Sequence, residues 1–106
     1  MPPCKQSNYQ TAGGYLHVDL VNNPGLLSTD PNLSFKSAIW FWMKAGTLAR
    51  TCHSAIVNQL GFGPTTRIIN GIECNGAHPN EQQDRVDLYL SFCGTFGISC
   101  AKQLYC

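Results

Sequence analysis

The sequence predicts an all-α fold that is linked by disulfides and has little or no β structure. Apolar residues in the stretch 34–43 recur at intervals of three and four, as they do along one face of a helix. The same spacing returns in the stretch 86–93. Six cysteines in 106 residues indicate disulfides formed in an oxidising compartment, so we expect a secreted, extracellular protein.

Length and charge narrow the classes of function. A chain of 106 residues is expected to form one domain over residues 1–106. The net charge is +1 and 12% of residues are charged, which excludes the basic surface that a nucleic-acid partner requires. No apolar run reaches membrane-spanning length, so no membrane partner is expected either. Met1 to Cys4 lacks the features of a signal peptide, which indicates a mature form or an excised segment.

The first part of the chain contains the clearest helix. Residues 1–14 are rich in Pro, Gly and small polar residues and are expected to be irregular. Residues 22–25 predict a turn, preceded by a short helix or an extended piece. Asp30 is a suitable N-cap for a helix that begins with Pro31 and stops at Gly46.

That helix is apolar around most of its circumference, so we expect it at the buried centre of the fold. Trp40 and Phe41 lie off its most regular apolar face. The residues of the regular face are Phe35, Ala38, Ile39, Trp42 and Met43.

Three further helices are expected. Thr51 caps one that runs to Leu60, and another covers about residues 65–70. After a loop at 73–78, Pro79 opens the last helix, which Gly94 ends. The tail from residue 95 has no periodicity and carries two cysteines, so crosslinks are expected to attach it to the body.

Few residues of the sequence are candidates for catalysis, ligand binding or metal coordination. Glu73 and Arg85 are either a charged pair lining a groove or a structural salt bridge, and their residue types fit both. Cys52 and His53 are sequence neighbours whose side chains diverge by about 100° on a helix, so they are not a nucleophile and its base. The histidines show no metal-ligand spacing and no C-x-x-C pair occurs, so we expect no metal and no cofactor.

Several segments together resemble the plant-type chitinases of glycoside hydrolase family 19. They cover about Ser7 to Cys106 and keep the order of the family. The matching segments are SNYQTAG, VDLVNNPGLLSTDPNLSFKSAIWFWM, CHSAIV, GFG, RIINGIEC and QDRVDLYLSFCG, then a tail ending LYC.

The resemblance implies a lysozyme-like helical lobe with the Ile-Trp-Phe-Trp helix at its centre. It also implies that Cys74 pairs with Cys106, and that chitin or related N-acetylglucosamine polymers are the ligand class. The pairing of the other cysteines stays open.

The resemblance further implies roles for four residues. Asn8 matches an Asn that contacts sugar, and Asn70 matches one that places substrate and the attacking water. Arg85 matches an Arg that pairs with the catalytic acid, and Glu73 matches the acid that completes this network. One glycine, Gly71, follows Asn70 where the family usually has two, and the loop between residues 53 and 65 is shorter than usual.

Both catalytic glutamates of the family lie in the half of its domain that precedes the matched segment, so no catalytic residue is assigned here. We expect a truncated, chitinase-like protein that is not an enzyme by itself and binds chitin-like glycans weakly or acts as a structural protein. Two alternatives remain. One is a self-assembling oligomer or filament that uses the face exposed by the missing half, and the other is the C-terminal part of an active inverting endochitinase.

Overall fold

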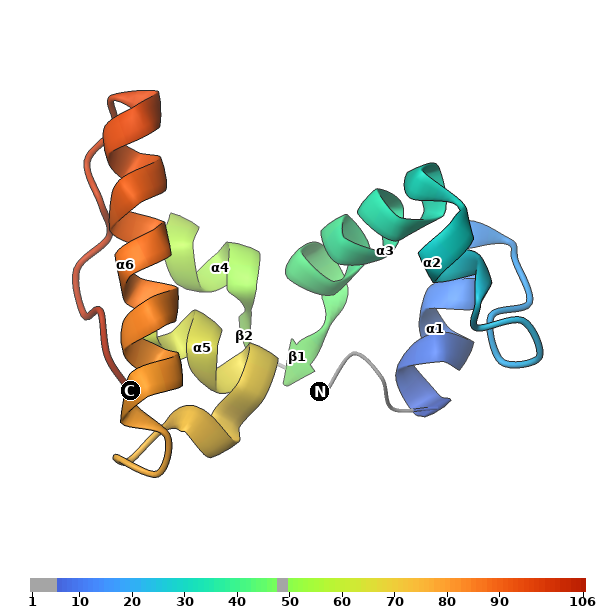
Figure 1. The fold of residues 1–106 in the computed structure, drawn as a ribbon, viewed down its shortest axis with the longest axis horizontal. Helices are drawn as coiled ribbons and strands as arrows, with labels where there is room; N and C mark the ends of the chain where they lie inside the picture. The colour runs from blue at the N-terminus through green and yellow to red at the C-terminus, as the bar shows by residue number, and fades with distance from the viewer. Residues whose placement is uncertain (1–5, 48–49) are drawn as a thin grey trace.

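Helices dominate the computed structural model, which describes residues 6–47 and 50–106. Figure 1 shows two groups of helices, α1 to α3 on one side and α4 to α6 on the other, with the short strands between them. The all-α prediction is confirmed. No helix in the described residues is long and apolar enough to cross a membrane. The elements are α1 (Gln6–Leu16), α2 (Leu26–Thr29), α3 (Pro31–Lys44), β1 (Gly46–Thr47), β2 (Arg50–Thr51), α4 (Cys52–Val57), α5 (Gly63–Asn70), the 3₁₀ turn η2 (Gly71–Glu73) and α6 (Pro79–Phe96).

Helix α1 corrects the prediction of an irregular start. Residues 6–14 are helical, while residues 1–5 lie outside the described residues. Ala12 and Gly13 are buried, and Ala12 packs with Leu20 and Trp40 in one core cluster. A side chain at Gly13 would come 2.5 Å from the carbonyl oxygen of Val18, so only glycine lets the chain return so closely. Tertiary packing, rather than intrinsic propensity, therefore stabilises this helix.

Helix α3 begins where the sequence predicts. Asp30 caps it by accepting hydrogen bonds from the backbone N–H groups of Asn32 (3.0 Å) and Leu33 (3.3 Å), and Pro31 is its first residue. These contacts satisfy donors that have no partner inside the helix. The helix ends at Lys44, two residues before the predicted stop at Gly46.

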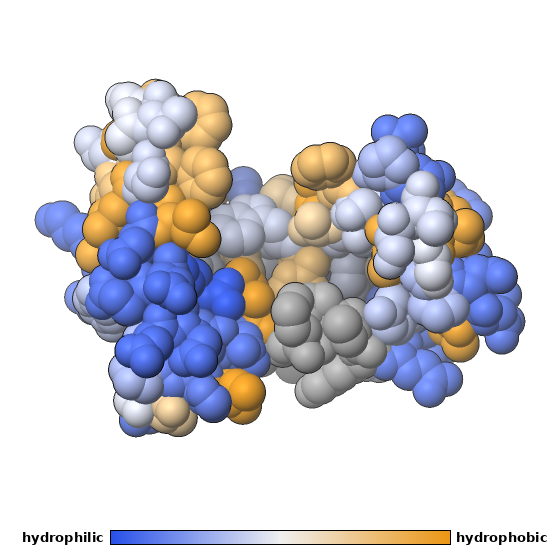
Figure 2. Space-filling view, viewed as in Figure 1, coloured by the Kyte–Doolittle hydropathy of each residue, from blue (hydrophilic) through white to orange (hydrophobic). Residues whose placement is uncertain are grey.

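The buried face of α3 is not the predicted one. Trp40 is buried, whereas Phe35 and Ile39 are 73% and 62% exposed and Met43 is exposed as well. Because the helix is apolar on nearly all sides, spacing alone did not show which side meets the core. Phe35, Ile39 and Met43 define the exposed apolar face of α3. Figure 2 shows hydrophobic surface over this helix.

The second group of helices is bounded by local signals. Thr51 and Ser54 form the reciprocal hydrogen bonds of a capping box at the start of α4, as expected for a Thr cap. This helix ends at Val57 rather than Leu60. Helix α6 runs past the predicted stop at Gly94 to Phe96, because Gly97 (φ 65°) takes the left-handed conformation that ends it.

The tail runs back along α6 and the start of α5. The backbone N–H groups of Phe62 and Gly63 donate to the carbonyl oxygens of Lys102 (3.0 Å) and Gln103 (2.6 Å). A disulfide joins Cys106 to Cys74, the pair that the family resemblance implies. We refer to residues 100–106 as the tail strap. It is held by backbone hydrogen bonds along its length and by a covalent bond at its end.

Candidate functional site

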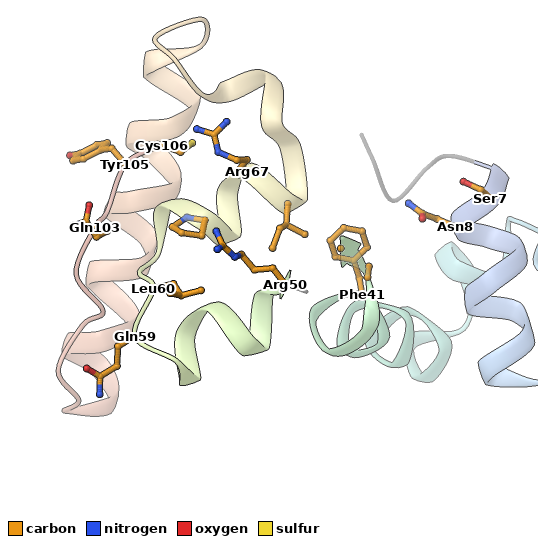
Figure 3. A pocket seen from close by; sticks show the side chains of 14 residues that line it. Ser7, Asn8, Phe41, Arg50, Gln59, Leu60, Arg67, Gln103, Tyr105 and Cys106 are labelled. Carbon is orange, nitrogen blue, oxygen red and sulfur yellow. The ribbon is translucent and has the colours of Figure 1, made fainter. Parts of the chain in front are cut away.

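An open groove of about 950 Å³ lies between the two groups of helices. In Figure 3, Ser7 and Asn8 on α1 and Phe41 on α3 lie on one side of the groove. Arg67 on α5 and residues of the tail strap lie on the other side. The short β1–β2 pair joins these walls, and α3 contacts β2 and α4 beside it. The groove is therefore built at the junction of segments that are far apart in the sequence.

The lining carries polar side chains on both sides among apolar ones such as Phe41, Leu60 and Ile68. Asn8 is the one residue of the four predicted for sugar contact that lies in this lining. Arg50 and Arg67 line the opposite side and are exposed. Sequence reasoning missed both arginines, although cations are scarce in this chain and each one is a candidate for contact with a ligand.

A second constellation lies at the join of α5, η2 and α6. The Arg85 guanidinium donates to both carboxylate oxygens of Glu73, from Nε to Oε1 at 3.1 Å and from Nη2 to Oε2 at 2.6 Å. Asn70 donates from Nδ2 to Oε2 at 2.9 Å. The structure thus brings together Asn70, Glu73 and Arg85, which we call the carboxylate network. None of these three residues is among those that line the groove.

Burial makes this network strong. Glu73 is 3% exposed, so water cannot replace the hydrogen bonds that it receives. The hydrogen bonds from Arg85 lower the pKa of the Glu73 carboxyl, with a smaller contribution from Asn70, and they outweigh burial, which acts in the opposite direction. Glu73 therefore stays ionised at neutral pH and holds both neighbouring side chains in fixed orientations.

Gln82 anchors the backbone of the same region. Its Nε2 donates to the carbonyl oxygen of Glu73 at 3.2 Å, and its Oε1 accepts from the backbone N–H of Cys106 at 2.7 Å. The disulfide at Cys74 lies directly beside Glu73 in the chain. With a single glycine after Asn70, Glu73 still reaches Arg85 in this arrangement. Gln82 was missed by sequence reasoning, although its position one turn before Arg85 places the two on one side of α6.

The remaining carboxylates make local contacts or, like Asp84, are exposed at the surface. Asp19 accepts from the backbone and side chain of Asn22 (3.1 and 2.7 Å), and these hydrogen bonds lower its pKa. Asp87 accepts from Gln83 at 2.8 Å. Glu81 lies 3.9 Å from His78 at the surface. Asp30 is used as a helix cap, and Arg85 holds Glu73 in its ionised form by lowering the pKa of that carboxyl.

Comparison with known proteins decides the family. The sequence pattern of the family described as chitinase class I, glycoside hydrolase family 19, matches residues 3–106. The chain belongs to glycoside hydrolase family 19. A basic 30 kDa endochitinase of Solanum lycopersicum and endochitinase B of Nicotiana tabacum are each 41% identical to it over 113 aligned residues. Each alignment covers 93% of this chain and 35% of the relative.

Solved structures of family 19 chitinases share the fold. Chitinase C from Streptomyces griseus superposes with a TM-score of 0.88 at 39% identity, over 95% of this chain and 49% of that one. The class IV chitinase of Zea mays gives 0.81 at 33% identity, over 94% and 46%. The chain therefore spans about a third of the length of these curated relatives and about half of each solved domain.

Proposed function

We propose that this chain is a chitinase-like segment that binds chitin or related N-acetylglucosamine glycans weakly and does not hydrolyse them by itself. The carboxylate network carries the proposal, because it brings Asn70, Glu73 and Arg85 together on a family 19 fold. Donation from Asn70 to Glu73 holds the Asn70 amide and leaves its oxygen as an acceptor for a sugar N–H or O–H. Asn8 supplies a separate polar contact, in the lining of the groove.

The lack of hydrolysis follows from electrostatics. An inverting glycosidase needs two carboxyl groups roughly 6.5 to 9.5 Å apart, one of them protonated by a raised pKa. Glu73 has a lowered pKa and is neutralised by Arg85, so it is a poor general acid. The other acids cap helices, stabilise turns or lie at the surface.

Secretion belongs to the same proposal. The Cys74–Cys106 disulfide joins a loop to the end of the tail strap, and such bonds persist in oxidising compartments. Glycan polymers of cell walls are also found outside the cytosol, so the ligand class and the compartment agree.

Titration with chitin oligosaccharides tests the binding part. Trp40 and Trp42 lie on α3, next to Phe41, which lines the groove. A change in their fluorescence therefore measures binding of an oligosaccharide in the groove. We expect saturation with a Kd of about 1 mM, equivalent to about −4 kcal/mol. Cello-oligosaccharides, which lack the N-acetyl group, serve as the matched control. No change at saturating chitin oligosaccharide, or the same change with the cello-oligosaccharide, would count against the proposal.

A reducing-end assay on the same oligosaccharide tests the catalytic part. We expect no product above the rate without protein, and the Asn70→Ala variant should weaken binding without altering this result. Measurable hydrolysis by the wild-type chain would show that another group supplies the acid.

One observation favours a second candidate function, that of the C-terminal part of an active inverting endochitinase. The exposed apolar face of α3 has no cover among the described residues, and the solved relatives are about twice as long as this chain. An apolar surface of this kind is typical of a binding interface. The half of a family 19 domain that the alignments leave outside this chain is a fitting occupant.

Reconstitution separates the two candidates. The chain is mixed with the preceding half of a family 19 domain, and sedimentation and hydrolysis are measured on the mixture. A complex with activity supports the endochitinase candidate, whereas monomers without activity support the non-catalytic binder. Oligomers of the chain alone would instead indicate self-assembly through the α3 face.

A further inference from the structure

Two cysteines meet where the chain reverses after α6. Cys93 is buried in the last turns of α6, and Cys100 is half-buried at the start of the tail strap. Between them, Gly97 takes a left-handed conformation and the backbone N–H of Ile98 donates to the carbonyl oxygen of Cys93 at 3.0 Å. This hydrogen bond therefore ties the reversal of the chain to the backbone of Cys93.

Tyr89 holds the returning segment of the chain against the same face of α6. It lies one turn before Cys93, so both side chains project from one side of the helix. Its hydroxyl oxygen accepts a hydrogen bond from the backbone N–H of Ala101 at 2.6 Å, next to Cys100. The Tyr89 ring stacks on Phe62 with centroids 4.1 Å apart, which restrains this anchor.

These two contacts bring the free thiols of Cys93 and Cys100 close together. The nearby Cys93 side chain raises the pKa of Cys100 to about 11, with a smaller effect from burial. A cysteine with such a pKa is a slow nucleophile and, once bonded, a slow leaving group. These properties favour a structural disulfide over a catalytic thiol pair.

We propose that Cys93 and Cys100 form a second intramolecular disulfide when the protein matures in an oxidising compartment. The oxidant is a small-molecule disulfide such as oxidised glutathione. The Cys100 thiolate attacks one of its sulfurs and releases one glutathione thiolate, and the Cys93 thiolate then attacks the Cys100 sulfur and releases the second. The two cysteine protons pass to the two glutathione thiolates, so two thiols are oxidised and one disulfide is reduced.

The bond would attach the tail strap at both ends. Cys74–Cys106 holds its far end, while Lys102 and Gln103 accept hydrogen bonds from Phe62 and Gly63 in between. Gln103, together with Tyr105 and Cys106, lines the groove. Closing Cys93–Cys100 therefore fixes one wall of the groove independently of any ligand.

Thiol alkylation after denaturation, followed by peptide mapping, tests the pairing on the full chain matured in a glutathione redox buffer. We expect alkylation of Cys4 and Cys52 only, with an intact mass about 4 Da below that of the reduced chain, since each disulfide removes two hydrogens. Trypsin should cleave after Lys102 about tenfold more slowly in this form than after reduction of Cys93–Cys100, because opening of the strap limits cleavage.

Two variants keep the test decisive. Cys100→Ser replaces a half-buried thiol and should leave Cys93 open to alkylation, while Cys4→Ser should retain both disulfides. The proposal is overturned if Cys93 and Cys100 are both alkylated in chains whose Cys74–Cys106 bond is closed. A tryptic peptide that joins either of them to another cysteine would overturn it equally.

Discussion

Replacement of Arg85 by glutamine is the sharpest test of the carboxylate network. The Arg85→Gln change removes the cation and both charge-assisted hydrogen bonds to Glu73 but keeps the aliphatic base of the side chain and a shorter polar end. Glu73 is then a buried carboxylate whose remaining side-chain donor is Asn70. We expect a large loss of stability at neutral pH.

The size of the expected loss in the free energy of unfolding follows from how deeply Arg85 and Glu73 are buried. Breaking a fully buried ion pair by removing one partner costs about 3–5 kcal/mol. The side chain of Arg85 is 30% exposed whereas that of Glu73 is 4% exposed, so some water can enter on the arginine side. We therefore expect the free energy of unfolding to fall by about 2–3 kcal/mol.

The pH dependence gives a second, independent signature. In the wild type the pKa of Glu73 lies below its ordinary value of 4.5, so its contribution is complete above that pH and is lost as pH falls through the folded-state pKa. In Arg85→Gln, burial acts without the opposing cation and raises the pKa of Glu73. Acidification then neutralises the stranded charge, and the difference between variant and wild type should shrink towards about pH 4.

Urea unfolding followed by Trp fluorescence, at several pH values, measures both effects. Arg67→Gln is the matched control, because Arg67 is an exposed arginine outside the network, and it should change stability by less than about 0.5 kcal/mol. The reasoning would be refuted by an Arg85→Gln variant as stable as the control at neutral pH, or by a loss that does not depend on pH.

Three further predictions concern the first group of helices. Asp30→Ala should cost about 1 kcal/mol in urea unfolding, because it removes a cap that accepts two backbone N–H groups, and an unchanged midpoint would contradict this. Gly13→Ala should destabilise α1, since the added carbon meets a backbone oxygen, whereas Gly14→Ala meets nothing and should raise the thermal midpoint slightly; equal effects of the two would refute the packing argument. Ile39→Asp should change monomer stability by less than about 0.5 kcal/mol but abolish any association through the α3 face, while Trp40→Ala should cost about 3–5 kcal/mol; sedimentation and urea unfolding distinguish these outcomes.

Local chemistry explains why several elements were predictable. Asp30 and Thr51 act on backbone groups two or three residues away, so the starts of α3 and α4 were confirmed without knowledge of the fold. The prediction that Gly94 ends the last helix was wrong. Glycine is common after a helix end, but Gly94 is itself helical and does not take the left-handed conformation that ends a helix. Gly97, with its positive φ, provides that conformation.

Positions that depend on distant partners were harder. Helix α1 contains two adjacent glycines, and its stability comes from packing against Leu20 and Trp40, which no local pattern reveals. The groove likewise collects residues of α1, α3, α5 and the tail strap, so Arg50 and Arg67 gave no signal in the sequence beyond their charge. The family resemblance named Asn70, Glu73 and Arg85 because it carries tertiary information from other chains.

The sequence by itself determined the helical class, the capped starts of α3 and α4, and the family. These features rest on periodicity, on contacts within one turn and on motifs of several residues. Only the tertiary structure decided which side of α3 is buried, that Arg85 binds Glu73, and that the chain reversal after α6 brings Cys100 close to Cys93. The physical reason is range: a helix with apolar residues on every side can be buried on any of them, and the packing of α1 and α2 against α3 selects the Trp40 side.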